Sequence, residues 1–172
     1  MLLLQIDEAL ASETRSAGCS CGGILHRANY PRKPRCCPEV VRPDFESRFS
    51  FCCNQCRKRT TSISVRFLGR RVYLGLAVVL MSAGRAHAAS IIAQLSEALN
   101  IPMRTIYRWR QWWRELFPIT PLWQASCARF MPPVDLRLLP LSLIERFAGI
   151  PEEAMQRLLI FLSPLTVKFR SR

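Results

Sequence analysis

Eight cysteines occur in this chain of 172 residues, and four of them form two closely spaced pairs. Cys19 and Cys21 lie in the segment GCSCGG, and Cys53 and Cys56 lie in the segment CCNQC. A tetrahedral Zn²⁺ ion binds four soft ligands, which two tight turns could supply as two pairs. We therefore predict one structural zinc ion held by these four thiolates. A site closed by four thiolates has no open position for a substrate, so we expect no metal catalysis.

The choice of ligands leaves some alternatives open. Cys53 is preferred to Cys52 because it has the Cys-x-x-Cys spacing with Cys56 and shares a strand face with Phe51. Cys-x-Cys is one residue shorter than the usual first knuckle of a zinc ribbon, so Cys19 is the ligand most open to replacement. The candidate substitutes are His26, Cys36, Cys37 and Cys52. Disulfides are disfavoured because the start, MLLLQIDEAL, lacks the features of a signal peptide, which favours a reducing cytoplasmic location.

A strong positive charge indicates a polyanionic partner. The formal net charge is +13 and the isoelectric point is about 10.3, and residues 19–71 carry twelve Lys and Arg against three acids. Nucleic acid is the partner that such a charge favours, although a cationic run also suits a solvated surface. The residues that we expect to contact phosphates after the second cysteine pair are Arg57, Lys58, Arg59, Arg66, Arg70 and Arg71. The proline-bounded segment PRKPR is either a second basic arm or a solvent loop.

The segment AQLSEALNIPMRTIYRWRQWW has the pattern of a helix-turn-helix. Residues 88–99 predict a support helix, Asn100 and Pro102 predict a tight turn, and residues 103–117 predict a recognition helix closed by Pro118. The inner face of that helix should pack against Ile91, Leu95 and Leu99 of the support helix. This inner face consists of Ile106, Trp109, Trp113 and Leu116. The opposite face should read bases with Met103, Arg104, Tyr107, Arg108 and Gln111, while Arg110 and Arg114 contact phosphate from the side. Trp112 should be half-exposed.

The chain as a whole predicts a mainly α fold with a small β zinc ribbon. Hydrophobic residues make up 49% of the sequence, which is enough to bury a core. We expect an N-terminal arm or short helix over 1–17, a zinc-ribbon-like domain over 18–66, a three-helix helix-turn-helix domain over 70–118 and a helical extension over 119–172. Within these, we predict helices over 72–83, 121–130, 141–148 and 152–162.

Two of these motifs together resemble the DNA-binding portion of bacterial insertion-sequence transposases. RFSFCCNQCRKRT is similar to the second knuckle of their zinc ribbon, and LSEALNIPMRTIYRWR is similar to the helix-turn-helix that follows it. The resemblance covers roughly residues 18–117 and implies recognition of element ends or promoter DNA. Those transposases continue into a nuclease domain with catalytic carboxylates, whereas only about 55 residues follow here and they are predicted helical. The resemblance therefore implies a transposition or transcription factor without strand-transfer activity.

Other functions find less support in the sequence. No phosphate-binding glycine loop and no Ser-His-Asp arrangement is present, and we expect no enzymatic activity. The longest apolar run, residues 72–83, is shorter than a membrane-spanning helix, so we expect no membrane contact. The apolar residues of segment 138–162 either cover the helix-turn-helix core or form a surface for a homodimer or a protein partner. An adaptor that binds a partner through this tail and contacts DNA or RNA without specificity is the alternative function.

Overall fold

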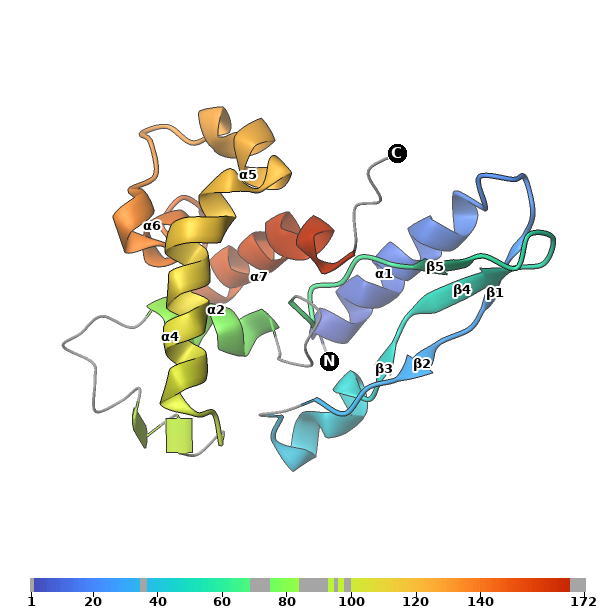
Figure 1. The fold of residues 1–172 in the computed structure, drawn as a ribbon, viewed down its shortest axis with the longest axis horizontal. Coiled ribbons are helices and arrows are strands. Elements are labelled where there is room, and N and C mark those ends of the chain that lie inside the picture. Colours follow the sequence, from blue (N-terminus) through green and yellow to red (C-terminus); the bar gives the residue numbers. More distant parts are fainter. Residues whose placement is uncertain are drawn as a thin grey trace. The chain divides into compact units, whose positions relative to one another are not determined.

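The computed structural model describes residues 2–34, 37–68, 75–83, 93–94, 96–97 and 100–167, which belong to two compact units (Figure 1). Unit 1 comprises Met1–Leu74 with Leu162–Arg172, and unit 2 comprises Gly75–Phe161. The described chain is mainly helical with a small antiparallel sheet of three strands. This confirms the predicted mainly α class with a small β part.

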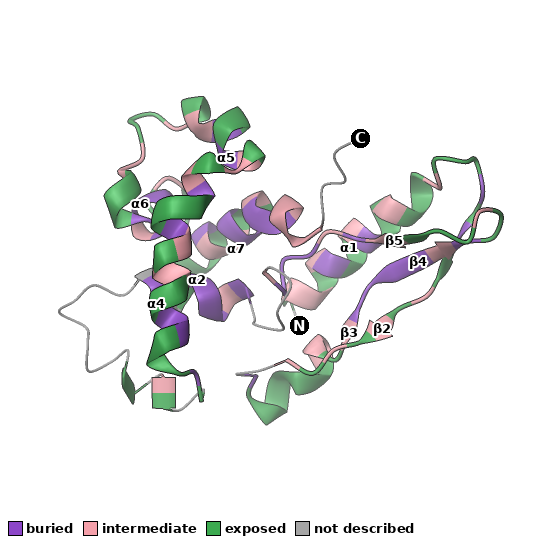
Figure 2. Ribbon diagram, viewed as in Figure 1, coloured by how far each residue is buried: buried purple, intermediate pink, exposed green. Residues whose placement is uncertain are grey.

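Unit 1 is built on two small antiparallel sheets. The three-stranded sheet has the order β1-β4-β5, with β1 at Leu25–Arg27, β4 at Ser50–Cys53 and β5 at Arg59–Thr61. The second sheet pairs β2 (Tyr30–Pro31) with β3 (Ser47–Arg48), and the 3-10 helix η1 covers Glu39–Phe45. Figure 2 shows that the central strand β4 is buried along most of its length. The sheet therefore has its core at β4 and an edge at β5.

Helix α1 (Leu2–Ser16) packs against this sheet in unit 1. Its buried Ala11 lies in one cluster with Leu25, Phe49, Phe51 and Cys53. Phe51 and Cys53 are 2% and 0% exposed, which confirms that they share the inner face of β4. A core of this size is small, so a further crosslink between its loops would add much to the stability of the unit.

A buried ion pair joins α1 to the segment after β5. The Nε atom of Arg66 lies 2.7 Å from a carboxylate oxygen of Asp7, and both side chains are 1% exposed. The same carboxylate accepts hydrogen bonds from the Ser64 hydroxyl and from the Val65 backbone N–H at 2.5 and 2.6 Å. The other guanidinium nitrogens donate to the carbonyl oxygens of Asp44 and Ser47. The prediction that Arg66 contacts phosphate is therefore wrong, because its side chain is buried and forms an ion pair with Asp7.

The end of the described chain also belongs to unit 1. The 3-10 helix η7 (Ser163–Thr166) places the Thr166 hydroxyl where it accepts hydrogen bonds from the Ser64 backbone N–H at 3.0 Å and from Arg48 at 3.2 Å. These bonds link positions about a hundred residues apart in the sequence. Residues 163–167 are thus an integral part of unit 1.

Unit 2 contains helices only, within the residues described there. They are α2 (Gly75–Ala83), α4 (Met103–Gln111), the π-helical turn η3 (Trp112–Leu116), η4 (Phe117–Ile119), α5 (Pro121–Ser126), η5 (Cys127–Arg129), η6 (Leu136–Leu138), α6 (Leu141–Ile144) and α7 (Pro151–Leu162). Helices α2 and α4 pack against each other. Residues 93–94 and 96–97 are helical, but most of the predicted support helix, including Ile91, Leu95 and Leu99, lies outside the described residues.

The turn before α4 has the predicted geometry. Asn100 has a φ of 50°, in the left-handed region that asparagine tolerates better than most residues. The backbone N–H groups of Asn100 and Ile101 donate to the carbonyl oxygens of Glu97 and Ser96, as at a helix end. Pro102 caps α4 rather than lying within its first turn, and Ile101 is 1% exposed.

The register of α4 changes at its C-terminal end. Ile106 and Trp113 are fully buried and Trp109 is half-buried, as predicted, but Leu116 is 51% exposed and Phe117 is buried in its place. The turn Trp112–Leu116 is π-helical, so it contains more residues than a regular α-turn. The prediction of an inward Leu116 is therefore wrong. Pro118 does not close the helix either, since it lies within the following turn η4.

The rest of unit 2 follows the predicted helices closely. The stretch predicted over 121–130 is divided between α5 and η5, and the stretch predicted over 152–162 is α7. The helix predicted over 141–148 is shorter, because α6 ends at Ile144. A chain of aromatic contacts joins η3, α5 and α7, with neighbouring ring centroids 4.8 to 5.8 Å apart; its members include Trp113, Phe117, Trp123, Phe130 and Phe161.

Candidate functional site

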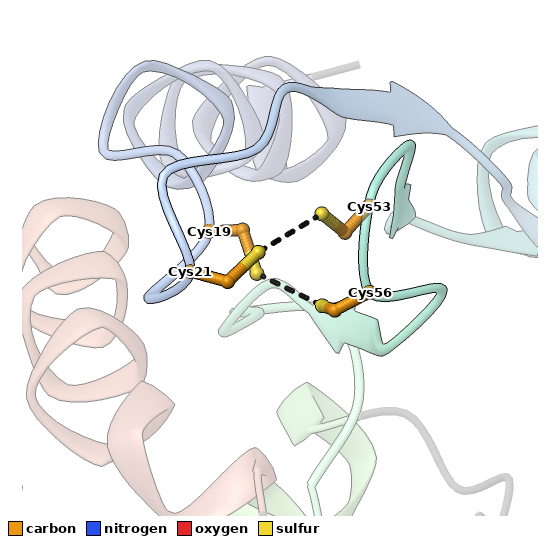
Figure 3. Close-up of side chains that lie close together, drawn as sticks. All are labelled: Cys19, Cys21, Cys53 and Cys56. Atoms are coloured by element: carbon orange, nitrogen blue, oxygen red, sulfur yellow. Dashed lines mark hydrogen bonds between the residues drawn. The ribbon is translucent and has the colours of Figure 1, made fainter.

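Four cysteine sulfurs meet at one end of the ribbon sheet (Figure 3). Cys19 and Cys21 come from the loop between α1 and β1, Cys53 is the last residue of β4, and Cys56 lies in the turn between β4 and β5. The Sγ atoms of Cys19 and Cys56 are 3.5 Å apart, as are those of Cys21 and Cys53, and all four lie within 4.8 Å of one another. A tetrahedral ion with metal–sulfur bonds of about 2.3 Å separates its ligands by about 3.8 Å. These four predicted ligands could therefore hold one metal ion.

The sulfurs are too far apart for disulfides. A disulfide requires a sulfur–sulfur distance of about 2.05 Å, whereas all four cysteines are free thiols. The burial of the site is graded, since Cys53 is buried, Cys19 and Cys56 are half-buried and Cys21 is exposed. Solvent and metal therefore reach the cluster from the side of Cys21.

Backbone hydrogen bonds shape both turns. The Gly22 N–H donates to the Cys19 carbonyl at 2.8 Å, and the Cys19 N–H donates to the Gly23 carbonyl at 3.2 Å, which closes the first turn. The two turns are also joined to each other, because Ile24 donates to the Asn54 side chain at 2.9 Å and Asn54 donates to the Ile24 carbonyl at 3.0 Å. These bonds hold together the two turns that carry the sulfurs.

Gly23 is required by the close approach of the two turns. A Cβ atom at this position would lie 2.5 Å from Sγ of Cys53 and 2.9 Å from Oδ1 of Asn54. A larger residue would therefore displace a ligand atom. Gly22, its neighbour, has a φ of +83°, which favours glycine for a separate reason.

The thiols of the cluster differ in acidity, and two of them have a lowered pKa. Hydrogen bonding by the Cys56 backbone N–H, aided by that of Gln55, lowers the pKa of Cys53 to about 6 despite desolvation. The Cys21 backbone N–H likewise lowers the pKa of Cys19. The Lys58 N–H lowers the pKa of Cys56, but desolvation and the three neighbouring thiols together raise it to about 12. Backbone N–H groups thus already point at the sulfur atoms that a cation would bind as thiolates.

The alternative ligands lie apart from the cluster. Cys52 lies on the opposite face of β4, and its Sγ atom lies 3.5 Å from the carbonyl oxygen of Arg57. His26 is exposed on β1, and Cys37 is buried, where desolvation raises its pKa. Cys36 lies outside the described residues.

The predicted phosphate-contacting residues after the knuckle are accessible where the structure describes them. Arg57, Lys58 and Arg59 are exposed, and Arg57 has a φ of 57° at the end of the turn. Arg59 donates to the Ala28 carbonyl at 3.2 Å. Arg70 and Arg71 lie outside the described residues. Arg57, Lys58 and Arg59 therefore form an exposed cationic surface next to the cysteine cluster, which we call the basic tip.

The outer face of α4 carries the residues predicted to read bases. All of them are exposed, including Arg114 in η3: Met103, Arg104, Tyr107, Arg108, Gln111 and Arg114. Trp112 is half-buried, as predicted, and its ring centroid lies 5.0 Å from that of Trp113. The Gln111 amide donates to Glu115 at 2.9 Å, and Arg108 donates weakly to the Thr105 hydroxyl at 3.4 Å. Cationic and amide groups thus lie side by side on this face.

Sequence reasoning did not identify Asn54 as part of the metal-site framework. Its role depends on hydrogen bonds to Ile24, which is distant in the sequence. The only signal was its place in the Cys-x-x-Cys turn, where asparagine is common because its side chain bonds to nearby backbone.

Comparison of the chain with protein-family models, curated proteins and solved structures finds no match. None of the described helices combines the length and the apolar character that crossing a membrane requires. The function must therefore be inferred from the two sites themselves.

Proposed function

We propose that this protein is a zinc-stabilised DNA-binding protein. In this proposal, helix α4 and the turn η3 read duplex DNA, and the basic tip of the ribbon holds phosphates. The protein would act as a transposition-related or transcriptional accessory factor, in keeping with the resemblance of its two motifs to insertion-sequence transposases.

The proposal of zinc rests on the chemistry of the four ligands. Four thiolates within 4.8 Å of one another suit Zn²⁺ or an iron centre better than hard cations, which prefer oxygen ligands. The site lies beside the small core of unit 1, and Cys19 and Cys56 pack against that core. A bound ion would crosslink the two ribbon turns and stabilise the folded unit. Its role would be structural, and Lys58 and Arg59 would be held by the turn that it fixes.

The DNA-binding proposal rests on the residue types of the exposed face of α4 and η3. Arg104, Arg108 and Arg114 are exposed there, and Glu115 is the acidic residue of this helix. Arginine binds guanine edges in a bidentate manner, and glutamine binds adenine in the same way. A left-handed turn at Asn100 before such a helix is the arrangement through which helix-turn-helix proteins present a recognition helix.

The test is selection of a random duplex DNA pool by the zinc-loaded protein at near-physiological salt, followed by sequencing. At that salt, nonspecific phosphate attraction is weakened and base reading dominates the enrichment. We expect an enriched motif with the wild type. The variant with both Arg104→Ala and Arg108→Ala should lose the motif while retaining general affinity.

The matched control is Arg129→Ala, which removes an exposed arginine of unit 2 from η5. It should enrich the same motif as the wild type. A pool that stays flat with the wild type would refute sequence reading. It would favour the adaptor function, in which the basic surface binds nucleic acid without specificity.

A further inference from the structure

A groove lies along the edge strand β5 of unit 1. It has a volume of about 760 Å³, and its lining consists of Tyr30, Lys58, Arg59, Thr60, Thr61, Thr166 and Val167. One wall is the edge strand β5 and another is the C-terminal segment that begins with η7. We call it the β5 groove. The described residues of its lining contain two cations, three threonine hydroxyls and one aromatic ring, and none of them has a carboxylate.

Three arginines, one of them the lining residue Arg59, lie close to the aromatic residue of this groove. The guanidinium carbon of Arg32 lies 4.9 Å from the ring centroid of Tyr30, and that of Arg59 lies 5.7 Å from it. Arg32 also donates to the Tyr30 hydroxyl at 3.3 Å, which fixes the ring. Arg48 is the strand partner of Tyr30 in the β2–β3 pair. The ring is therefore held in place within a cluster of cations.

Arg48 adds a buried positive charge behind the groove wall. Its side chain is 3% exposed, and it donates to the Ser62 carbonyl at 2.8 Å and to the hydroxyl of Thr166, which lines the groove. Its Nη1 atom is buried and has no hydrogen-bond partner among the described residues. Burial lowers the pKa of Arg48, but a guanidinium remains charged at neutral pH.

The carboxylate of Asp7 forms its ion pair with Arg66 and not with Arg48. Asp7 still interacts electrostatically with Arg48. Arg48 therefore places a buried guanidinium beneath a groove that already carries Lys58 and Arg59. Such a potential attracts an anion into the groove.

We propose that the β5 groove binds a single strand of nucleic acid, with phosphates at Lys58 and Arg59 and a base beside Tyr30. Cavities that hold a small ligand have volumes of roughly 300–1,000 Å³, so this groove can admit a nucleotide or two of one strand but not a duplex. A cationic groove combined with an aromatic side chain is the usual composition of single-strand sites. This inference goes beyond the proposed function, because it gives Lys58 and Arg59, which that proposal assigns to duplex phosphates, a single-stranded ligand together with Tyr30.

The test compares the binding of a fluorescent oligothymidine with that of a fluorescent duplex, by anisotropy at near-physiological salt with the full zinc-loaded chain. Tyr30→Leu should weaken oligothymidine binding about tenfold, because the stacking ring is lost. Tyr30→Phe keeps the ring and should bind within about threefold of the wild type. Arg59→Gln should lower the slope of log affinity against log salt by about 0.7, as expected when one phosphate contact on a single strand is lost.

Arg15→Gln serves as the charge-matched control, since Arg15 is exposed on α1 and does not line the groove. It should leave both affinities unchanged. Tyr30→Leu should also leave the duplex affinity unchanged, and its α1 segment should show wild-type protection from hydrogen exchange. Oligothymidine binding that is absent in the wild type, or unchanged by a folded Tyr30→Leu variant, would overturn the inference.

The two proposals fail in different ways in this experiment. Duplex binding that depends on Arg104 and Arg108, with no binding of oligothymidine, would leave the proposed function standing and remove the single-strand site. Oligothymidine binding that depends on Tyr30, with no duplex binding, would do the reverse. Binding of neither probe would remove both.

Discussion

A Cβ atom added at Gly23 would lie 2.5 Å from the Sγ atom of Cys53, so the absence of a side chain at one turn sets the position of a ligand on the other. Gly23→Ala removes no thiol but forces the two turns apart. We expect this variant to bind zinc at least about tenfold more weakly than the wild type, since displaced ligands lose tetrahedral geometry. Competition with a chromogenic chelator measures the affinity.

Ser20→Ala is the control for this substitution, because Ser20 is exposed in the same turn. It should bind zinc as the wild type does. A Gly23→Ala protein with wild-type zinc affinity would show that the turns can separate without loss of the site, and would contradict the close-approach argument.

The two adjacent cysteines of β4 should respond differently to replacement. Cys53→Ser removes a buried sulfur of the cluster, whereas Cys52→Ser removes a thiol on the other face of the strand. We expect Cys53→Ser to lose stoichiometric zinc and Cys52→Ser to retain one zinc per chain, as measured by elemental analysis of the purified proteins. Zinc retained by Cys53→Ser and lost from Cys52→Ser would mean that Cys52 is the ligand.

The four ligands could be predicted because the Cys-x-Cys and Cys-x-x-Cys spacings are local and metal chemistry restricts the ligand types. The exposed face of α4 was predictable for a similar reason, since helical periodicity separates Ile106 and Trp113 from Arg104 and Arg108. Both depend on short stretches of chain.

Contacts between distant segments could not be predicted in this way. Arg66 follows a basic run and resembles a surface cation in the sequence, yet it pairs with Asp7, which lies 59 residues earlier. The β5 groove likewise needs Thr166 beside β5, at a sequence separation that no local pattern encodes. The π-helical turn that exposes Leu116 depends on the packing of several aromatic rings, and periodicity alone gives a regular helix there.

Loss of the carboxylate at position 7 should destabilise unit 1. Asp7→Asn leaves the buried guanidinium of Arg66 without its counter-ion, and breaking a buried ion pair costs about 3–5 kcal/mol. All four tryptophans lie outside unit 1, so tryptophan fluorescence would not report this change directly. Hydrogen exchange of residues 2–16 should reveal a much lower free energy of opening. Glu8→Gln, an exposed neighbour on α1, should leave exchange unchanged, and equal protection in both variants would refute a stabilising role for the pair.

The register of the last turn before Pro118 can be tested with two adjacent residues. Phe117 is fully buried, with its ring centroid 4.8 Å from that of Trp113 and 5.2 Å from that of Trp123, whereas Leu116 is 51% exposed. Phe117→Ala should lower the free energy of unfolding of unit 2 by about 3–5 kcal/mol, because it leaves a cavity among aromatic rings. Leu116→Ala should lower it by no more than about 0.5 kcal/mol. Urea unfolding followed by tryptophan fluorescence reports this unit, since its four tryptophans lie there. A larger effect at Leu116 than at Phe117 would indicate a regular α-helical turn in place of the π-helical one.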